Sequence, residues 1–139
     1  MTITTRWYDT DKTIACYDFV GAWTWEELAT AIAEIEAMLK SVPHRVDVII
    51  DFSKSPGEPP RGLLTQIRGK TLSKLDNWGG GVFVGFSPFL RVLFNTLKRL
   101  EPSMGSYYAI ADSVEDAHQV IVKRRAAQTD TIIKDAPGR

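Results

Sequence analysis

Apolar residues recur along this chain with two spacings, one typical of strands and one typical of helices. Short runs rich in Val, Ile, Tyr and Phe are bounded by polar residues, Gly or Pro, which predicts strands. Longer segments carry apolar residues three or four positions apart, which predicts amphipathic helices. The pattern predicts strands over 3–8, 13–20, 46–52, 82–86 and 106–111, and helices over 24–42, 61–75, 88–100 and 114–127.

Local signals mark where several of these elements begin. Thr24 and Glu27 have the spacing of a capping box, in which each residue's side chain bonds the other's backbone N–H. Ser87 followed by Pro88 combines a preferred N-cap residue with proline at the first helical position. The polar residues 9–12 separate the first two strands and are typical of a hairpin turn. The helices that begin after Thr24 and after Ser87 therefore have starts that local hydrogen bonds define.

The order of the predicted elements is ββαβαβαβα. Strands separated by one helix each pair in parallel through right-handed crossovers, and the first hairpin adds an antiparallel strand at one edge. The segment 46–52 is too apolar to be half exposed, so we expect it to be a central strand. The fold predicted is α/β, a five-stranded mixed sheet that is mostly parallel, with four main helices. We expect one domain over residues 1–126 and a frayed polar tail over 127–139.

The element order resembles that of STAS-like domains, the fold of bacterial anti-sigma factor antagonists, and especially the SpoIIAA-like branch, which is related in architecture to CRAL-TRIO lipid-transfer domains. Members of that family carry an Asp at the end of a strand and then Asp-Ser-Ser-Gly at the start of the next helix. Asp51 and Gly62 fit this pattern and place 59–62 over that motif. The second serine is the family's phosphorylation switch, and here the position holds Arg61. The resemblance implies that this chain keeps the fold of the family but lacks its phosphorylation switch.

The distribution of charge and the cysteine content indicate which partners and which cellular compartment we expect for this protein. The chain has a formal net charge of zero, yet residues 61–104 hold seven basic residues against two acidic ones. This stretch could attract an anionic partner, or it could form the solvated faces of two helices. The single cysteine, Cys16, excludes an internal disulfide and fits a reducing cytoplasm. No apolar run approaches the roughly 18 residues of a membrane span, and the first residues do not resemble a secretion signal.

The sequence contains none of the catalytic or zinc-binding motifs considered below. His44 and His118 are the two histidines, and neither has a spacing suited to zinc. No serine lies in a nucleophile elbow. The glycines 79–81 precede a strand rather than a helix, so we interpret them as a turn and not as a phosphate loop. We therefore expect neither an enzyme nor a cofactor.

Polar residues follow the predicted strands, at the edge where parallel sheets often bind ligands. Ser and Asp are also preferred N-cap residues, and the sequence favours helix capping over a ligand site as the explanation for them. A small enzyme that uses this edge is the weakest of the alternatives. The residues are Asp51, Ser53, Ser87, Asp112 and Ser113.

The segment 88–100 carries more apolar side chains than one helix face can bury. Phe89, Leu93, Leu97 and Leu100 form one stripe, and further apolar residues extend beyond it. The strands show a similar surplus. Alternation predicts one face with Ile14, Cys16, Val48, Ile50, Val82, Val84, Tyr108 and Ile110, and another with Tyr17, Phe19, Ile49, Phe83 and Tyr107. Either helices cover both faces of the sheet or an aromatic patch stays open. We expect Leu90 and Phe94 to contact a partner, with Arg91 nearby at the rim.

Two classes of function follow from this surplus. The first is a non-catalytic regulatory or protein-interaction module that binds a protein partner or itself, with a homo-oligomer expected. The second is a carrier or sensor of an apolar anionic ligand such as a lipid. We expect no nucleic-acid partner. The candidate binding residues are Leu90, Phe94, Arg91, Arg61, Asp51, Ser53 and Ser87.

Overall fold

Five strands form a single mixed sheet in the order β1-β2-β3-β4-β5. The computed structural model describes residues 2–57, 59–62 and 75–135, and for 103, 104 and 128–135 it describes the backbone alone. The first pair of strands is antiparallel and the other three pairs are parallel, as predicted. The strands are β1 (Ile3–Trp7), β2 (Ile14–Val20), β3 (Val46–Lys54), β4 (Trp78–Val84) and β5 (Tyr108–Ala111).

Four helices accompany the sheet in the described residues. Thr24 and Glu27 form the predicted capping box at the start of α1. The side chain of Ser87 accepts a hydrogen bond from the backbone of Leu90 and caps α3. The predicted helix over 61–75 falls on 63–74, outside the described residues. The helices are α1 (Trp25–Lys40), α3 (Pro88–Leu100), α4 (Ser103–Tyr107) and α5 (Val114–Asp135).

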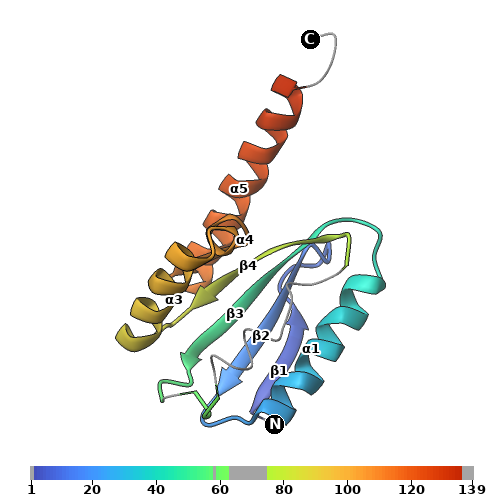
Figure 1. The fold of residues 1–139 in the computed structure, drawn as a ribbon. Coiled ribbons are helices and arrows are strands. Elements are labelled where there is room, and N and C mark those ends of the chain that lie inside the picture. Colours follow the sequence, from blue (N-terminus) through green and yellow to red (C-terminus); the bar gives the residue numbers. More distant parts are fainter. Residues whose placement is uncertain (1, 58, 63–74, 136–139) are drawn as a thin grey trace.

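Helices cover both faces of the sheet (Figure 1). On one face, Ala117 and Ile121 of α5 pack against Ile14, Cys16 and Ile49. On the other face, residues of α1 pack against β2 and β3; these are Ile35 and Leu39, against Ala15, Val46 and Val48. The surplus of apolar residues in the strands is thus largely explained by a sheet with two covered faces.

The expected division of residues between the two faces is wrong for β3 and β5. The alternation predicts Val48 and Ile50 on the face of Cys16, and Ile110 on the face of Val82. Ile110 instead pairs with Phe83. In the structure Cys16 pairs with Ile49, and Tyr17 pairs with Ile50. Paired residues share a face, and a shift of register by one residue exchanges the faces of a whole strand. Tyr17, Ile50 and Phe83 therefore lie together on the α1 face.

The glycines 79–81, predicted to form a turn, lie inside β4, which begins at Trp78. Gly79 lies against the side chain of Arg45, where a Cβ would also come within 2.6 Å of the Asp47 carboxylate. Gly80 has φ +128°, and a Cβ there would come within 2.5 Å of the Tyr107 carbonyl oxygen. The glycines are needed because neighbouring groups occupy the space of their side chains.

Two boundaries near the C-terminus also differ from prediction. The strand expected over 106–111 begins at Tyr108, because the short helix α4 occupies Ser103–Tyr107. The last helix continues to Asp135, eight residues beyond its predicted end at residue 127. In Figure 1 its C-terminal half extends away from the sheet. No helix in the described ranges is long and apolar enough to cross a membrane.

Candidate functional site

The polar residues at the strand ends act mainly as local caps. The Asp51 carboxylate accepts a hydrogen bond from the backbone N–H of Ser53 at 2.9 Å. The Ser113 hydroxyl accepts from the backbone of Asp116 at 3.1 Å, in the same way that Ser87 caps α3. No hydrogen bond connects Asp51, Ser87 and Asp112 to one another in the described part of the chain. The capping interpretation favoured by the sequence is confirmed for Ser87 and Ser113, whereas Asp112 pairs with Arg91 and Asp51 bonds the backbone of its own strand.

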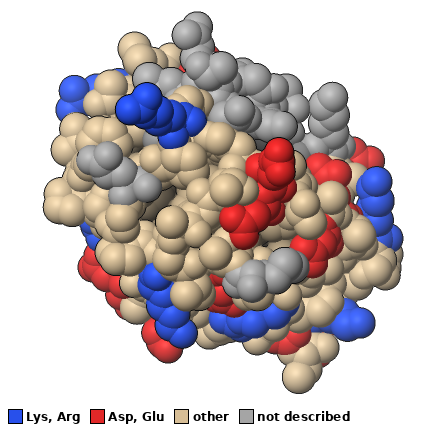
Figure 2. Space-filling view, turned by 90° about the horizontal axis from the view of Figure 1, so that it is seen from below, with Lys and Arg blue, Asp and Glu red and all other residues tan. Residues whose placement is uncertain are grey.

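The described residues show no concentration of basic side chains at the end of the molecule to which β2 and β3 point. In Figure 2 acidic side chains lie near the middle of this face, beside a broad area without charged residues. Asp18 and Asp51 are neighbours in the β2–β3 register, and Arg6 pairs with Asp18 at 2.7 Å. An anion would meet negative charge here, so this edge does not suit an anionic ligand.

Helix α3 buries a different face from the one expected. Phe94 is 6% exposed, and its ring contacts Phe83 and Phe86 with centroids 6.0 and 6.3 Å apart. Phe89 and Leu100, which were assigned to the packing stripe, are 60% and 73% exposed. Phe94 thus packs mainly in the protein's own core and contributes its remaining surface to a groove, so its contact with a partner stays a prediction.

An apolar surface remains on the outer side of α3. Phe89 and Leu100 lie near its two ends, and Val92, 66% exposed, lies between them. Residues 89, 92, 96 and 100 follow the spacing of one helix face. We call Phe89, Val92 and Leu100 the outer face of α3. The sequence could not separate it from the inner side, because Leu90 and Phe94 form an equally apolar stripe.

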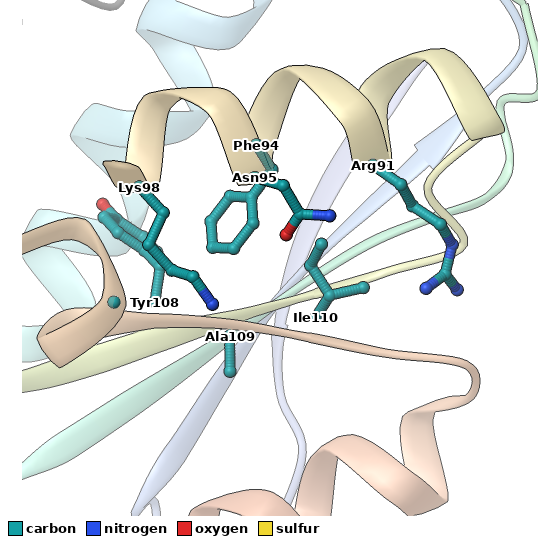
Figure 3. A pocket seen from close by; sticks show the side chains of 8 residues that line it. Arg91, Phe94, Asn95, Lys98, Tyr108, Ala109 and Ile110 are labelled. Atoms are coloured by element: carbon teal, nitrogen blue, oxygen red, sulfur yellow. The ribbon is translucent and has the colours of Figure 1, made fainter. Parts of the chain in front are cut away.

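A groove of about 410 Å³ lies between α3 and the edge strand β5 (Figure 3). The side chains of Arg91 and Lys98 lie at its two ends, and Asn95 and Phe94 lie between them. None of the sequence candidates at the strand ends lines the groove, and neither do Leu90 or Arg61. The lining residues are Arg91, Phe94, Asn95, Lys98, Gly105, Tyr108, Ala109 and Ile110.

The polar groups of the groove are mainly cationic. Arg91 pairs with the exposed Asp112 at 2.6 Å. The Lys98 ammonium lies 6.0 Å from the centre of the Phe94 ring, within the range of a cation–π interaction. Burial raises the pKa of Tyr108 to about 12, so its hydroxyl stays neutral at physiological pH. The groove thus offers positive charge above an apolar floor.

Arg61 lies in a different place from the residues of the groove. It occupies a turn, and its carbonyl oxygen accepts a hydrogen bond from the Trp25 indole N–H at 2.6 Å. Its side chain is exposed. The turn at Arg61 is therefore held against the start of α1. The sequence placed Arg61 and Arg91 in one candidate set, but the structure attaches them to different elements.

The histidines and the cysteine have structural contacts. His44 Nε2 lies 2.8 Å from the carbonyl oxygen of Lys12, and the His118 ring lies 5.4 Å from that of Tyr8. Cys16 is buried, and desolvation raises its pKa to about 12, which suppresses the reactive thiolate. Within the described ranges, no group of three or more His, Cys, Asp or Glu residues could hold a metal ion.

Comparisons with known proteins give no match: no family model, no curated protein and no solved structure resembles this chain closely enough to identify it. The site must therefore be interpreted from its own geometry. That geometry consists of the outer face of α3 and, beside it, the cationic groove along β5.

Proposed function

We propose that this chain is a non-catalytic interaction module of STAS-like type that binds a partner protein through the outer face of α3. The observation that carries the proposal is the exposure of Phe89, Val92 and Leu100 on one side of a helix whose other side is packed. Large apolar side chains gathered on one surface are typical of interfaces. Burying each of them fully would contribute about 1.5–3 kcal/mol.

Helix α3 carries basic but no acidic side chains, which indicates the kind of partner. Arg91 and Lys98 line the groove, and Arg99 is exposed next to Leu100 of the outer face. Lys98 and Arg99 form no ion pair with the acidic residues that the structure describes. Two copies of this helix packed together would bring like charges close. A partner with acidic residues around an apolar centre would instead gain attraction that weakens with salt.

The element order supports a STAS-like module, and Arg61 supports one without the phosphorylation switch. Arg61 is exposed in a turn, at the position that the resemblance gives to the switch serine. Its permanent positive charge is opposite in sign to that of a phosphate. Regulation by phosphorylation at this turn is therefore not part of the proposed function.

A second candidate function is the binding of an apolar anion. The observation that favours it is the groove beside α3, where Arg91 and Lys98 lie at the ends of an apolar floor. Native mass spectrometry of the purified protein tests it directly. A bound acid of fatty-acid mass would support this candidate, and a bare chain mass in every preparation would contradict it.

Site-specific photo-crosslinking tests the partner. A photoreactive phenylalanine analogue is placed at Phe89, Val92 or Leu100, and at Val122 of α5 as a control, because Val122 is also an exposed apolar residue. In extract of the producing cells, we expect the three α3 positions to crosslink one common protein and the Val122 position to give none of it. Equal crosslinking at Val122 would contradict the proposal.

Two substitutions control for folding in this experiment. Phe89→Asp is expected to keep the fold, because Phe89 is exposed, and to abolish the crosslink from Val92. Phe94→Asp is expected to unfold the protein, because it places a charge in the core. Circular dichroism measures the folding of both variants, and light scattering measures their molar mass in solution. A crosslinked species of twice the chain mass would show that the partner is a second copy of this chain and not another protein.

A further inference from the structure

Strand β5 forms one edge of the sheet. It pairs with β4 on one side, and in the described part of the chain no strand lies on its other side. An edge strand presents unpaired backbone N–H and C=O groups, which can bind another extended segment. Proteins often cover such an edge with a helix or a loop. Here Tyr108, Ala109 and Ile110 line the groove below α3 and are only half-buried. Figure 3 shows the groove between α3 and β5.

The groove has the dimensions of a short extended segment. It runs along Tyr108, Ala109 and Ile110 of β5, with α3 forming its other wall. Arg91 and Lys98 are seven residues apart on α3, which is about 10.5 Å along a helix. Alternate side chains of an extended chain share one face and lie about 6.7 Å apart. A segment lying beside β5 would therefore place two such side chains between these two cations, within reach of both.

The side chains that line the groove indicate which residue types a bound segment would carry. Arg91 and Lys98 favour carboxylates, and the Asn95 side chain lies between them. The ion pair of Arg91 with Asp112 is exposed, so it contributes little, and an incoming carboxylate can share the guanidinium. Phe94 and Ile110 offer apolar contact between the charges.

From this arrangement we infer that the groove binds an extended acidic peptide, which adds to β5 as a sixth strand beneath α3. Backbone hydrogen bonds to β5 provide affinity, and carboxylates at alternate positions, directed toward Arg91 and Lys98, provide specificity. A second copy of this chain fits less well, since residues 108–111 bring no acidic side chain. The inference goes beyond the proposed function, because it assigns an acidic peptide to a surface separate from the outer face of α3.

The probe for the test is the capped hexapeptide Val-Glu-Val-Glu-Val-Glu. It is titrated into the full chain labelled with ¹⁵N, and amide shifts are followed by NMR. We expect the largest shifts at Ala109, Ile110 and Ala111. A version of the peptide with methylated backbone nitrogens keeps the charge but loses hydrogen bonds, and should bind about tenfold more weakly.

Charge-reversal variants complete the test. Lys98→Glu should weaken binding about fivefold or more. Lys40→Glu, on α1, makes the same change of net charge at an exposed site and should leave binding unchanged. Thermal unfolding of both variants confirms that the fold is kept. Binding of the all-Lys analogue with equal affinity would contradict the expected charge preference.

The outcomes separate this inference from the proposed function. Absence of shifts in β5 at about 2 mM peptide, or equal binding of the methylated peptide, overturns the sixth strand, while crosslinking from the outer face of α3 can still succeed. Stronger binding of decanoate, with shifts at Phe94 and Ile110, would assign the groove to an apolar anion. Peptide binding at β5 without any α3 crosslink would support the inference and contradict the proposed function.

Discussion

Arg125 of α5 donates a hydrogen bond from Nε to the Asp47 carboxylate at 2.8 Å, across 78 positions of the chain. Asp47 is 1% exposed and also accepts a hydrogen bond from Arg45 at 3.0 Å. Arg125 further donates to the carbonyl oxygen of Thr13 at 2.8 Å. These bonds attach the last helix to the starts of β2 and β3, because Thr13 and Asp47 lie next to each other there.

The first prediction concerns this buried carboxylate. Asp47→Asn leaves two guanidinium groups without their anion, and both are about one-third exposed, so water compensates in part. We expect a loss of about 2–4 kcal/mol in the free energy of unfolding, measured by urea denaturation. Asp18→Asn, which removes the exposed pair with Arg6, is the control and should cost less than about 1 kcal/mol. Equal losses would show that burial of Asp47 contributes nothing.

The second prediction concerns Gly80. Gly80→Ala places a Cβ 2.5 Å from the Tyr107 carbonyl oxygen and strains a backbone with φ +128°. We expect destabilisation of about 2–4 kcal/mol, seen as a lower melting temperature. Gly57→Ala is the control, because no atom lies within 4 Å of the added carbon, and its effect should stay within about 0.5 kcal/mol. An unchanged melting temperature for Gly80→Ala would contradict the close approach of β4 and Tyr107.

The third prediction concerns the pH dependence of stability. Burial raises the pKa of Cys16 from 9.0 to about 12, so the native state keeps a proton that the unfolded chain releases above pH 9. Stability should therefore be independent of this group below pH 9 and fall as the pH rises from 9 toward 12. Between pH 9 and 10 the wild type should lose about 1 kcal/mol more than Cys16→Ala. Urea titrations at both pH values measure the difference, and parallel losses would contradict it.

A related measurement tests the burial of the same thiol. A disulfide reagent should modify Cys16 only after unfolding, because the thiol is buried and largely protonated at pH 8. Rapid labelling of the native protein would show that the sheet opens at β2.

The fourth prediction concerns the turn at Arg61. A serine kinase of the class that acts on anti-sigma factor antagonists should not phosphorylate this turn in the wild type, since the aligned position holds Arg61. Ser55 is buried and donates to the Gly21 carbonyl oxygen at 2.6 Å, which protects it. Arg61→Ser should gain one phosphate, detected by intact mass. Stoichiometric phosphate on the wild type would contradict the prediction, and an unmodified variant would remove support for the resemblance at this turn.

Local sequence signals were enough to predict the five strands and, among the described helices, α1, α3 and α5, but not the short α4. The capping box of Thr24 and Glu27 and the cap at Ser87 act within four residues of the chain, so their patterns can be recognised without a structure. The apolar run of β3 likewise indicated a central strand, and the sheet order confirms it.

The register and the glycines depended on distant parts of the chain. Nothing in either strand alone sets the pairing of Cys16 with Ile49, and a shift by one residue would exchange the faces of β3. Gly79 and Gly80 look like a turn in the sequence. Only the tertiary structure shows that Arg45 and Tyr107 occupy the space beside them within a strand.

The candidate site was the least predictable feature, because α3 carries apolar side chains around most of its circumference. Composition along 88–100 established that some would remain exposed. Packing of Phe94 against Phe83 and Phe86 decided which ones, since it turned Phe89 and Leu100 toward solvent. The groove exists only because α3 lies beside β5 in the fold, so the sequence determined its residue types and the tertiary structure brought them together.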